Sequence, residues 1–247
     1  MTVETLLPFM AIIALGTYVQ TVTGFALGMI VLGGVTGFGL APVAFTTVVI
    51  SLVSLANGVL VLKGNLSAID KRAVVAALAG LVPALVFGVW LLDYLSESFA
   101  RTLQLLLGAT IVCGGLFIML KPEPLKQRSG AVAFSAAGAA AGVIGGLFSI
   151  AGPPLVYQFY RQPLELRTIR LCLLSIFLIT SIGRTALIGL QDGLNLEIFL
   201  YTALALPVVA LFTWIGKQYP PPVSELWLRR FAFALLILIG TSLLITA

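Results

Sequence analysis

The sequence predicts an all-α membrane protein with many spans, and the evidence lies in its composition, its long apolar runs and its glycine-rich breaks. Of its 247 residues, 60% are hydrophobic and 9% are charged, whereas a soluble domain carries about 25% charged residues. The mean hydropathy is +1.13. The apolar runs are continuous, unlike the alternating segments of about 10 residues that build outer-membrane barrels. We therefore expect a single transmembrane transport domain over residues 1–247, whose first span begins at the N-terminus.

Several apolar runs are long enough to cross a bilayer, which takes about 20 residues in a helix. We expect spans at Ala41–Leu62, Val74–Leu92, Thr102–Leu120, Leu171–Leu190, Phe199–Gly216 and Phe231–Ala247. Two further regions, Leu6–Phe38 and Ala131–Tyr160, are apolar but interrupted by glycine. Each is too long for one span and short for two, so we expect two short helices joined by a turn at membrane depth. Such backbone is tolerated only where it is buried in protein or lines a cavity.

Basic residues mark one side of the membrane. Four loops contain Lys63, Lys71 and Arg72; Lys121, Lys126 and Arg128; Arg161, Arg167 and Arg170; and Lys217, Arg229 and Arg230. By the positive-inside rule these loops are cytoplasmic. This requires Leu6–Phe38 to begin and end outside, and Ala131–Tyr160 to begin and end inside. Two short helices satisfy both requirements, whether they are re-entrant or cross the membrane as a pair. We therefore expect a multi-pass protein of the plasma (inner) membrane with both termini outside.

The chain is expected to consist of two inverted repeats, residues 1–121 and 130–247. Each would be a glycine-broken helix pair followed by three transmembrane helices, which gives 8 to 10 membrane segments. Two pairs of similar segments indicate the repeat: Ser54–Leu66 with Ser181–Leu194, and Phe99–Gly108 with Leu228–Gly240. A repeat with an odd number of segments places its second copy upside down. Inverted repeats with broken helices are typical of secondary transporters, whose site lies near the midplane where the repeats meet.

Arg184 is a lone charge inside the apolar stretch Leu171–Leu190. A charge there costs about 2.5–3.5 kcal/mol on insertion scales, so such residues usually face a cavity or a partner. Its counterpart in the first repeat is Asn57. We expect the two on opposite sides of a central cavity, where the forked guanidinium would bind an oxyanion. The alternative is snorkelling, because Arg184 lies about 9 Å along the helix from Leu190 and its stem could reach the outer interface.

The glycine breaks are the second candidate for the binding site. Together with Arg184 and Asn57, the candidate substrate-binding residues are Gln20, Gly24, Phe25, Ser149, Gly152 and Pro153. A helix that begins inside the membrane presents free N–H groups and a positive dipole end to an anion, and proline suits its first turn. Two alternatives stay open. The glycines let helices pack closely, and polar residues such as Thr21 and Thr23 bond back to helix carbonyls.

Residues that the chain lacks exclude several classes of function. There is no His, the two cysteines are isolated, no apolar segment has Asp or Glu in its interior, and no ATP-binding loop occurs. We therefore expect no metal site, no cofactor and no enzymatic activity. We also expect no nucleic-acid partner, because the basic residues lie in loops and orient the protein in the membrane. The expected partners are a small anionic substrate and the lipid bilayer, and a homo-oligomer is compatible with both.

These motifs resemble those of a known family. The first break reads QTVTGFALG at residues 20–28, and the second has the form G-x-x-G-G-L-F-x-I-x-G-P-P-L at residues 142–155. Together with the length and the two halves, they resemble the TauE/SafE family over essentially the whole chain. Its members are called sulfite exporters. The family commonly has G-G-G where this chain has Ala151-Gly152-Pro153, and proline removes one N–H from that cradle.

The resemblance implies transport of small sulfur-containing anions, such as sulfite or sulfonates. We expect a secondary transporter that exports them by alternating access between the halves. Two alternatives stay open: an importer of the same anions, and a membrane subunit of a larger transport or enzyme complex that does not transport by itself.

Overall fold

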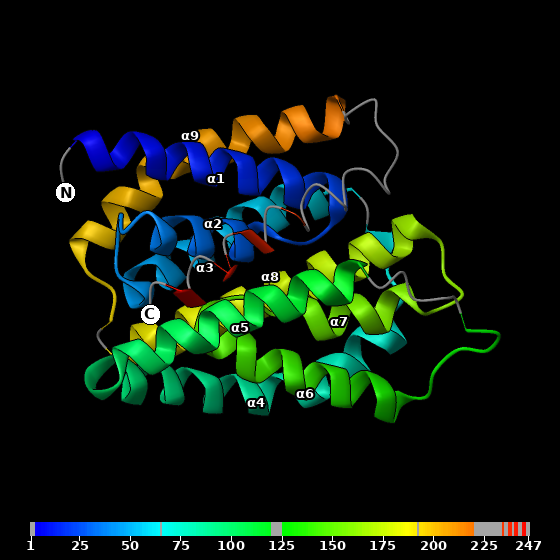
Figure 1. Ribbon diagram of the computed structural model, residues 1–247. Helices are drawn as coiled ribbons and strands as arrows, with labels where there is room; N and C mark the ends of the chain where they lie inside the picture. Colours follow the sequence, from blue (N-terminus) through cyan, green and yellow to red (C-terminus); the bar gives the residue numbers. More distant parts are fainter. Residues whose placement is uncertain are drawn as a thin grey trace.

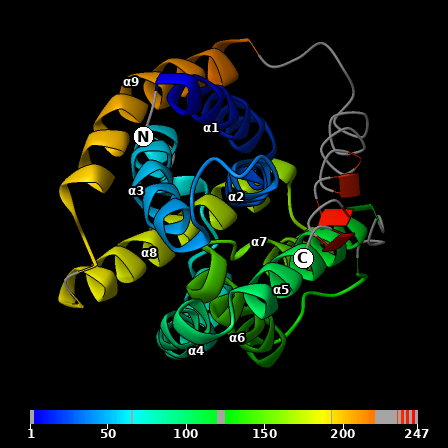
Figure 2. The same ribbon diagram turned by 60° about the vertical axis from the view of Figure 1, so that its left-hand side comes forward.

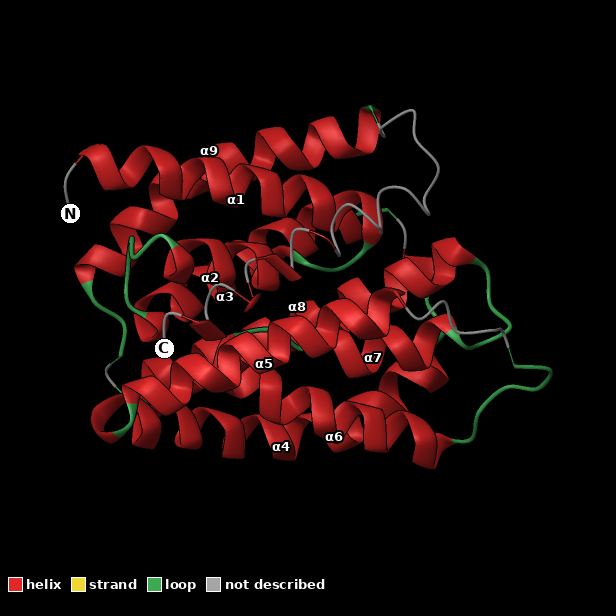
Figure 3. Ribbon diagram, viewed as in Figure 1, coloured by secondary structure: helices red, strands yellow, loops and turns green. Residues whose placement is uncertain are grey.

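The computed structural model describes residues 3–64, 66–119, 125–191 and 193–219, together with scattered residues between 234 and 245. Helices dominate this part of the chain, which contains no strand (Figure 3). Among the described helices, six are long and apolar enough to cross a membrane, judged by length and composition. The predicted class, an all-α membrane protein, is confirmed.

The helices agree closely with the expected spans. In chain order they are α1 (Val3–Thr23), α2 (Leu27–Gly37), α3 (Val43–Leu62), the 3-10 turn η1 (Leu66–Ala68), α4 (Lys71–Ser98), α5 (Ala100–Met119), α6 (Ala131–Phe148), α7 (Gly152–Tyr160), α8 (Leu166–Leu190) and α9 (Leu196–Gln218). Side-chain caps fix two of the starts, because Asp70 accepts from Ala73 N at 3.1 Å and Asn195 accepts from Ile198 N at 2.9 Å. The last expected span, Phe231–Ala247, lies mostly outside the described residues.

Both predicted breaks are present, but the expected pairs of short helices are wrong. Helices α1 and α6 have 21 and 18 residues, enough for a span, whereas α2 and α7 have only 11 and 9. A glycine inside a helix costs only about 1 kcal/mol relative to alanine, so the glycines before the breaks do not end α1 or α6. The helices end where the backbone turns left-handed, at Gly24 (φ 88°) and at Ser149 (φ 58°).

Each break turns the chain back on itself. Along the first hairpin, a Cβ built on Gly34 would contact Ile12, and one on Gly16 would contact Val31, so α1 and α2 are antiparallel. The second hairpin pairs α6 with α7, and it opens toward the opposite end of the bundle from the first (Figure 1). Between the hairpins, α3, α4 and α5 run from one end of the bundle to the other, and η1 lies in the α3–α4 connection.

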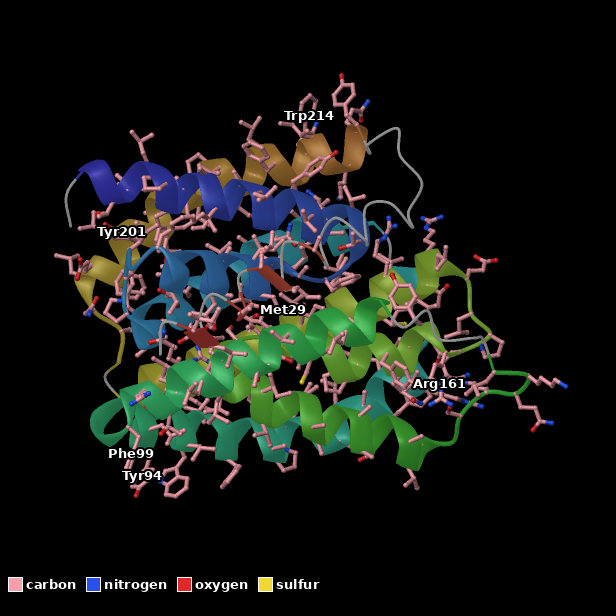
Figure 4. The ribbon with its side chains drawn as sticks, viewed as in Figure 1. Met29, Tyr94, Phe99, Arg161, Tyr201 and Trp214 are labelled. Atoms are coloured by element: carbon pink, nitrogen blue, oxygen red, sulfur yellow. The ribbon has the colours of Figure 1, made fainter. Side chains whose placement is uncertain are left out.

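The charged connections separate to the two ends of the bundle. The α3–α4 and α7–α8 connections, residues 125–130 before α6 and the C-terminal end of α9 lie at one end, marked by Arg161 in Figure 4. We call it the basic end, because its described cations are Lys63, Lys71, Arg72, Lys126, Arg128, Arg161, Arg167, Arg170 and Lys217. The α2–α3, α4–α5 and α8–α9 connections lie at the opposite end, near Tyr94 and Phe99 (Figure 4).

Exposed aromatic side chains lie near both ends. Trp90 and Tyr94 stack with ring centroids 6.1 Å apart, and Trp214 packs edge-on against Tyr219 at 5.9 Å. These four residues are all more than half exposed. Tyr94 and Trp214 mark opposite ends of the bundle in Figure 4. Two levels of Trp and Tyr are typical of a protein whose ends meet the two membrane interfaces.

Helices α4 and α6 pack with their backbones in contact. A Cβ added to Gly138, Gly142 or Gly146 of α6 would overlap a carbonyl oxygen of α4, and these glycines recur every four residues. Small residues at this spacing allow close helix packing in membranes. The close-packing interpretation is therefore right for these three glycines. On the other side of the bundle, α1 packs against α9 (Figure 2).

Candidate functional site

The two helix breaks meet at a small cavity inside the bundle. Its lining residues are Gln20, Ala26, Gly28, Met29, Ser54, Ser149, Ile150, Ala151, Gly152, Phe177, Thr180 and Ser181, and its volume is about 30 Å³. The breaks are in contact there, because a Cβ on Gly28 would lie 2.8 Å from the Ser149 carbonyl oxygen. Met29 lies between the two ends of the bundle in Figure 4. This central cavity has room for about two water molecules.

Three serines from three elements line this central cavity. Ser54 belongs to α3, Ser181 to α8, and Ser149 to the second break. A serine hydroxyl can donate a hydrogen bond to an anion or accept one from a neighbouring group. Within the α3–α8 sequence match, Ser54 and Ser181 occupy corresponding positions.

Two helices also begin at the central cavity, and their first turns line it. Gly28 and Met29 belong to the first turn of α2, and Gly152 is the first residue of α7. Backbone N–H groups of a first turn have no partner within the helix and favour negative charge. Pro153 and Pro154 lack an N–H, so Gly152 is the donor that α7 presents. The arrangement provides hydroxyl and amide donors for a small anion.

Arg184 lies beside this cavity and is fully buried. Its Nε donates to the Gly146 carbonyl oxygen at 3.0 Å, and Nη1 donates to the Thr47 carbonyl oxygen at 2.9 Å and to Ser51 Oγ at 3.0 Å. Nη2 donates to Thr47 Oγ1 at 2.9 Å. We call these four residues the Arg184 network. Because the guanidinium is held inside the bundle by α3 and α6, the snorkelling alternative is wrong.

The Arg184 network reaches the central cavity through two hydroxyls. Ser51 Oγ accepts from Arg184, donates to the Thr47 carbonyl oxygen at 2.9 Å and lies 2.9 Å from Ser149 Oγ. Ser149 in turn lines the central cavity. A hydroxyl that accepts from a cation becomes a better donor to its next neighbour. Two hydroxyls therefore link Arg184 to the cavity, although Arg184 is not among the residues that line it.

Asn57 is the centre of a second buried network. Its Nδ2 donates to Thr21 Oγ1 at 3.0 Å and to Thr213 Oγ1 at 2.8 Å, and its Oδ1 accepts from Gln20 Nε2 at 3.1 Å. Gln20 Oε1 accepts from Leu27 N, the first N–H of α2, at 3.3 Å. We call Asn57, Gln20, Thr21 and Thr213 the Asn57 network. It ties α1, α3 and α9 together next to the first break.

The predicted site residues therefore divide into two groups. Gln20, Ser149 and Gly152 line the central cavity. The other five lie outside its lining, and Arg184 and Asn57 belong to separate networks and do not face each other across it. The remaining three are packed elsewhere: Gly24 against Arg170, Phe25 edge-on against Tyr160 at 6.4 Å, and Pro153 against Gly114 of α5.

The alternative reading of the break threonines is confirmed. Thr21 and Thr23 donate to the carbonyl oxygens four residues earlier, Thr17 and Val19, at 2.8 and 2.7 Å. These bonds satisfy the hydroxyl within its own helix. Thr21 still accepts from Asn57, so one hydroxyl serves both roles.

Sequence reasoning missed Ser54, Ser181 and Thr180. The signal was present, because the two similar segments begin at Ser54 and Ser181. Each serine lies three residues before the more conspicuous polar residue of its segment, Asn57 or Arg184. Ala26 was missed as well; it adopts φ 85° at the first break, a conformation that is costly for a residue with a Cβ.

A larger cleft opens toward the end of the bundle opposite the basic end. It has a volume of about 520 Å³, and its polar lining residues are Asp93, Arg184, Gln191 and Asn195. Gln191 Nε2 donates to Asp93 Oδ2 at 2.8 Å across it. Val48 and Ile188 are among its apolar lining residues. We call this cleft the vestibule.

Comparison with known proteins agrees with these features. The model of the sulfite exporter TauE/SafE family matches residues 9–243. A relative from Cupriavidus necator, described as a probable sulfite/organosulfonate exporter TauE, is 50% identical over 250 residues, covering all of this chain and 98% of the relative. No solved structure matches. With both breaks, the apolar helices and this match over nearly its whole length, the chain belongs to the sulfite exporter TauE/SafE family of membrane transporters.

Proposed function

We propose that this protein is a secondary transporter that exports small sulfur-containing anions, such as sulfite or sulfonates, by alternating access. The observation that carries the proposal is the central cavity at the meeting point of the two helix breaks. Its donors are hydroxyl and backbone N–H groups, which suit the oxygen atoms of a sulfite or sulfonate group. Sites of this kind lie where inverted repeats meet in many secondary transporters.

The small volume of the central cavity supports a binding site that widens during transport. About 30 Å³ accommodates about two waters and no larger anion, so the cavity has to widen when substrate binds. The breaks provide the means, because the left-handed backbone of Ala26 and Ser149 is held by the surrounding packing and can relax when that packing changes.

Arg184 contributes positive charge without direct contact in this proposal. Its charge is buried among neutral oxygens of Thr47, Ser51 and Gly146. In a low-dielectric interior such a charge attracts an anion over several ångströms. When an anion arrives, Ser51 can turn its proton from the Thr47 carbonyl oxygen to Ser149 Oγ, and the Ser149 hydroxyl is then available to the anion. Arg184 therefore acts through Ser51 and Ser149.

Reciprocal contacts support two inverted halves, residues 1–121 and 130–247. A Cβ on Gly108 would lie 3.1 Å from Gly240 O, and a Cβ on Gly240 would lie 3.1 Å from Gly108 O. These glycines end the two similar segments of the sequence. Reciprocal contacts of equivalent residues are the mark of a twofold relation.

The two buried networks also support a twofold relation between the halves. Arg184 bonds to Gly146, three residues before left-handed Ser149, and Asn57 bonds to Thr21, three residues before left-handed Gly24. The packing of α6 on α4 likewise corresponds to that of α1 on α9. In each case the first helix of one half packs on a helix of the other half. Such packing is expected for two halves that rock against each other about a shared site.

The basic end is proposed to face the cytoplasm, in accordance with the positive-inside rule. The vestibule then faces outward. For a monovalent anion, a potential that is negative inside favours efflux by about 2.3 kcal/mol per 100 mV. Export therefore needs no coupling carboxylate inside a span.

The test is anion transport by purified protein in proteoliposomes. We expect efflux of sulfite and of methanesulfonate that accelerates when the compartment holding the anion is made electrically negative. Sulfate, chloride and acetate serve as competitors. Absence of flux for every sulfur-containing anion would overturn the transport proposal, and flux in the uptake direction alone would identify an importer.

Gly152→Ala should reduce transport without destabilising the protein. A Cβ at Gly152 would meet only Met29 Cε, at 3.7 Å, so it fits the fold but enters the cavity lining. We expect an unchanged melting temperature and a KM raised by about tenfold, the effect of displacing one hydrogen-bonded anion position. Gly37→Ala is the matched control, because a Cβ there meets nothing within 4 Å. Equal kinetics for both variants would remove Gly152 from the site.

A further inference from the structure

The Arg184 network lies between the central cavity and the vestibule. On α3, Val48 lines the vestibule, Ser51 belongs to the network and Ser54 lines the central cavity, so three successive levels follow at three-residue steps. On α8 the same order runs from Ile188 through Arg184 to Ser181. Residues three or four apart share one face of a helix. Any solute passing from the central cavity to the vestibule therefore meets the Arg184 network.

The Asn57 network lies on the other side of the central cavity. Asn57 follows Ser54 by three residues on α3, in the direction of the basic end. Its partners Thr21 and Thr213 lie near the C-terminal ends of α1 and α9, which also point toward the basic end (Figure 1). Gln20 joins this network to the cavity, because it lines the cavity and bonds Asn57.

Both networks span helices that belong to different halves of the chain. The guanidinium of Arg184, on α8, holds α3 through Thr47 and Ser51. Asn57, on α3, holds α9 through Thr213. Such bonds must break if the halves move relative to each other. Arg184 and Asn57 are themselves fully buried, so a broken bond exposes a polar group that only water or substrate can satisfy.

We propose that these two networks are the gates of the transport site: the Arg184 network closes the central cavity toward the vestibule, and the Asn57 network closes it toward the basic end. The inference rests on the proposed transport role of the central cavity and adds which residues open which side. The gates are equivalent in position but different in chemistry. The anion passes a cationic gate on the vestibule side and a neutral amide gate on the basic side.

The test measures access to the central cavity from each side. Ser54→Cys is the reporter, in a chain whose native cysteines are replaced by alanine, because Ser54 lines the cavity midway between Ser51 and Asn57. A charged, membrane-impermeant methanethiosulfonate is added to sealed right-side-out and inside-out vesicles. The modification rate is then followed by loss of maleimide-polyethylene glycol labelling.

Each gate is weakened by removing partners of its central residue. Thr47→Val with Ser51→Ala removes hydroxyl acceptors of Arg184, and Thr21→Val with Thr213→Val removes those of Asn57. We expect the first pair to raise the rate from the vestibule side about tenfold, and the second to raise it from the basic side by a similar factor. The rate from the other side should stay unchanged in each case. Ser175→Ala is the control, because that buried hydroxyl bonds only to Leu171 O of its own helix among the described contacts.

Two results would overturn the gate assignment: both pairs raising the rate from the same side, or folded variants that change neither rate. Folding is checked by gel filtration and melting temperature. If a double variant fails to fold, the single variants Thr47→Val and Thr213→Val must show the same sidedness with a smaller factor. The readout needs no transported substrate. Sidedness without anion flux would keep the gates and reject the proposed function, whereas flux without sidedness would do the reverse.

Discussion

Arg184→Ala is expected to lower sulfite efflux by about 100-fold or more, since charge-assisted hydrogen bonds contribute about 1.5–3 kcal/mol each and several are lost together. The substitution removes the buried positive charge. It also removes the hydrogen bonds that Arg184 donates to Thr47, Gly146 and Ser51. A gate that no longer closes toward the vestibule would stop the transport cycle at one step. Initial efflux rates per incorporated protein measure the effect.

Arg184→Lys separates charge from geometry. Lysine keeps the charge but is a point donor, and it cannot bond Gly146, Thr47 and Ser51 with the planar fork of arginine. We expect partial efflux, above Arg184→Ala and well below the wild type. Wild-type rates for Arg184→Ala would contradict the role assigned to the network. Equal loss in both variants would show that geometry alone matters.

Gly138→Ala is expected to destabilise the protein strongly. Its Cβ would overlap the carbonyl oxygen of Ala77, and backbone cannot move aside as a flexible side chain can. Overpacking of this kind costs about 1–3 kcal/mol, and here it must separate α4 from α6 along their length. The melting temperature of purified protein in detergent should fall by several degrees.

The matched control for this stability prediction is Gly37→Ala. Both substitutions replace a helical glycine by alanine and gain helix propensity, up to about 1 kcal/mol in a helix interior. Only Gly138 lies against another backbone; a Cβ at Gly37 meets nothing within 4 Å. An unchanged or raised melting temperature is therefore expected for Gly37→Ala. Equal melting temperatures for the two variants would contradict the close packing of α4 on α6.

The sequence predicted the architecture through signals that act locally. Apolar length identified α3, α4, α5, α8 and α9, and the glycine-rich stretches identified both breaks. It did not predict how each broken region divides into a long and a short helix. That division depends on where the backbone turns left-handed, and Ser149 and Ala26 do so without being glycine. Tertiary contacts hold those conformations, and single-residue preferences do not reveal them.

The sequence singled out Arg184 but not its surroundings. Burial of a charge was predictable from the apolar stretch around it. Its partners were not, because Thr47, Ser51 and Gly146 come from two other helices whose register against α8 is a property of packing. The glycines of α6 show the same limit. Gly138 and Gly152 both lie in the glycine-rich region before Tyr160, yet Gly138 packs against the backbone of α4 and Gly152 lines the central cavity.

The most direct test of the central claim is calorimetric titration of sulfite and methanesulfonate into purified wild type, a cavity variant and a vestibule variant. The cavity variant carries Ser54→Ala and Ser149→Ala; the vestibule variant is Gln191→Ala, which loses the bond to Asp93. If the anion binds at the central cavity, the cavity variant weakens binding by about tenfold or more and the vestibule variant binds like the wild type. Wild-type affinity in the cavity variant, with loss in the vestibule variant, would contradict the account and move the binding site to the vestibule.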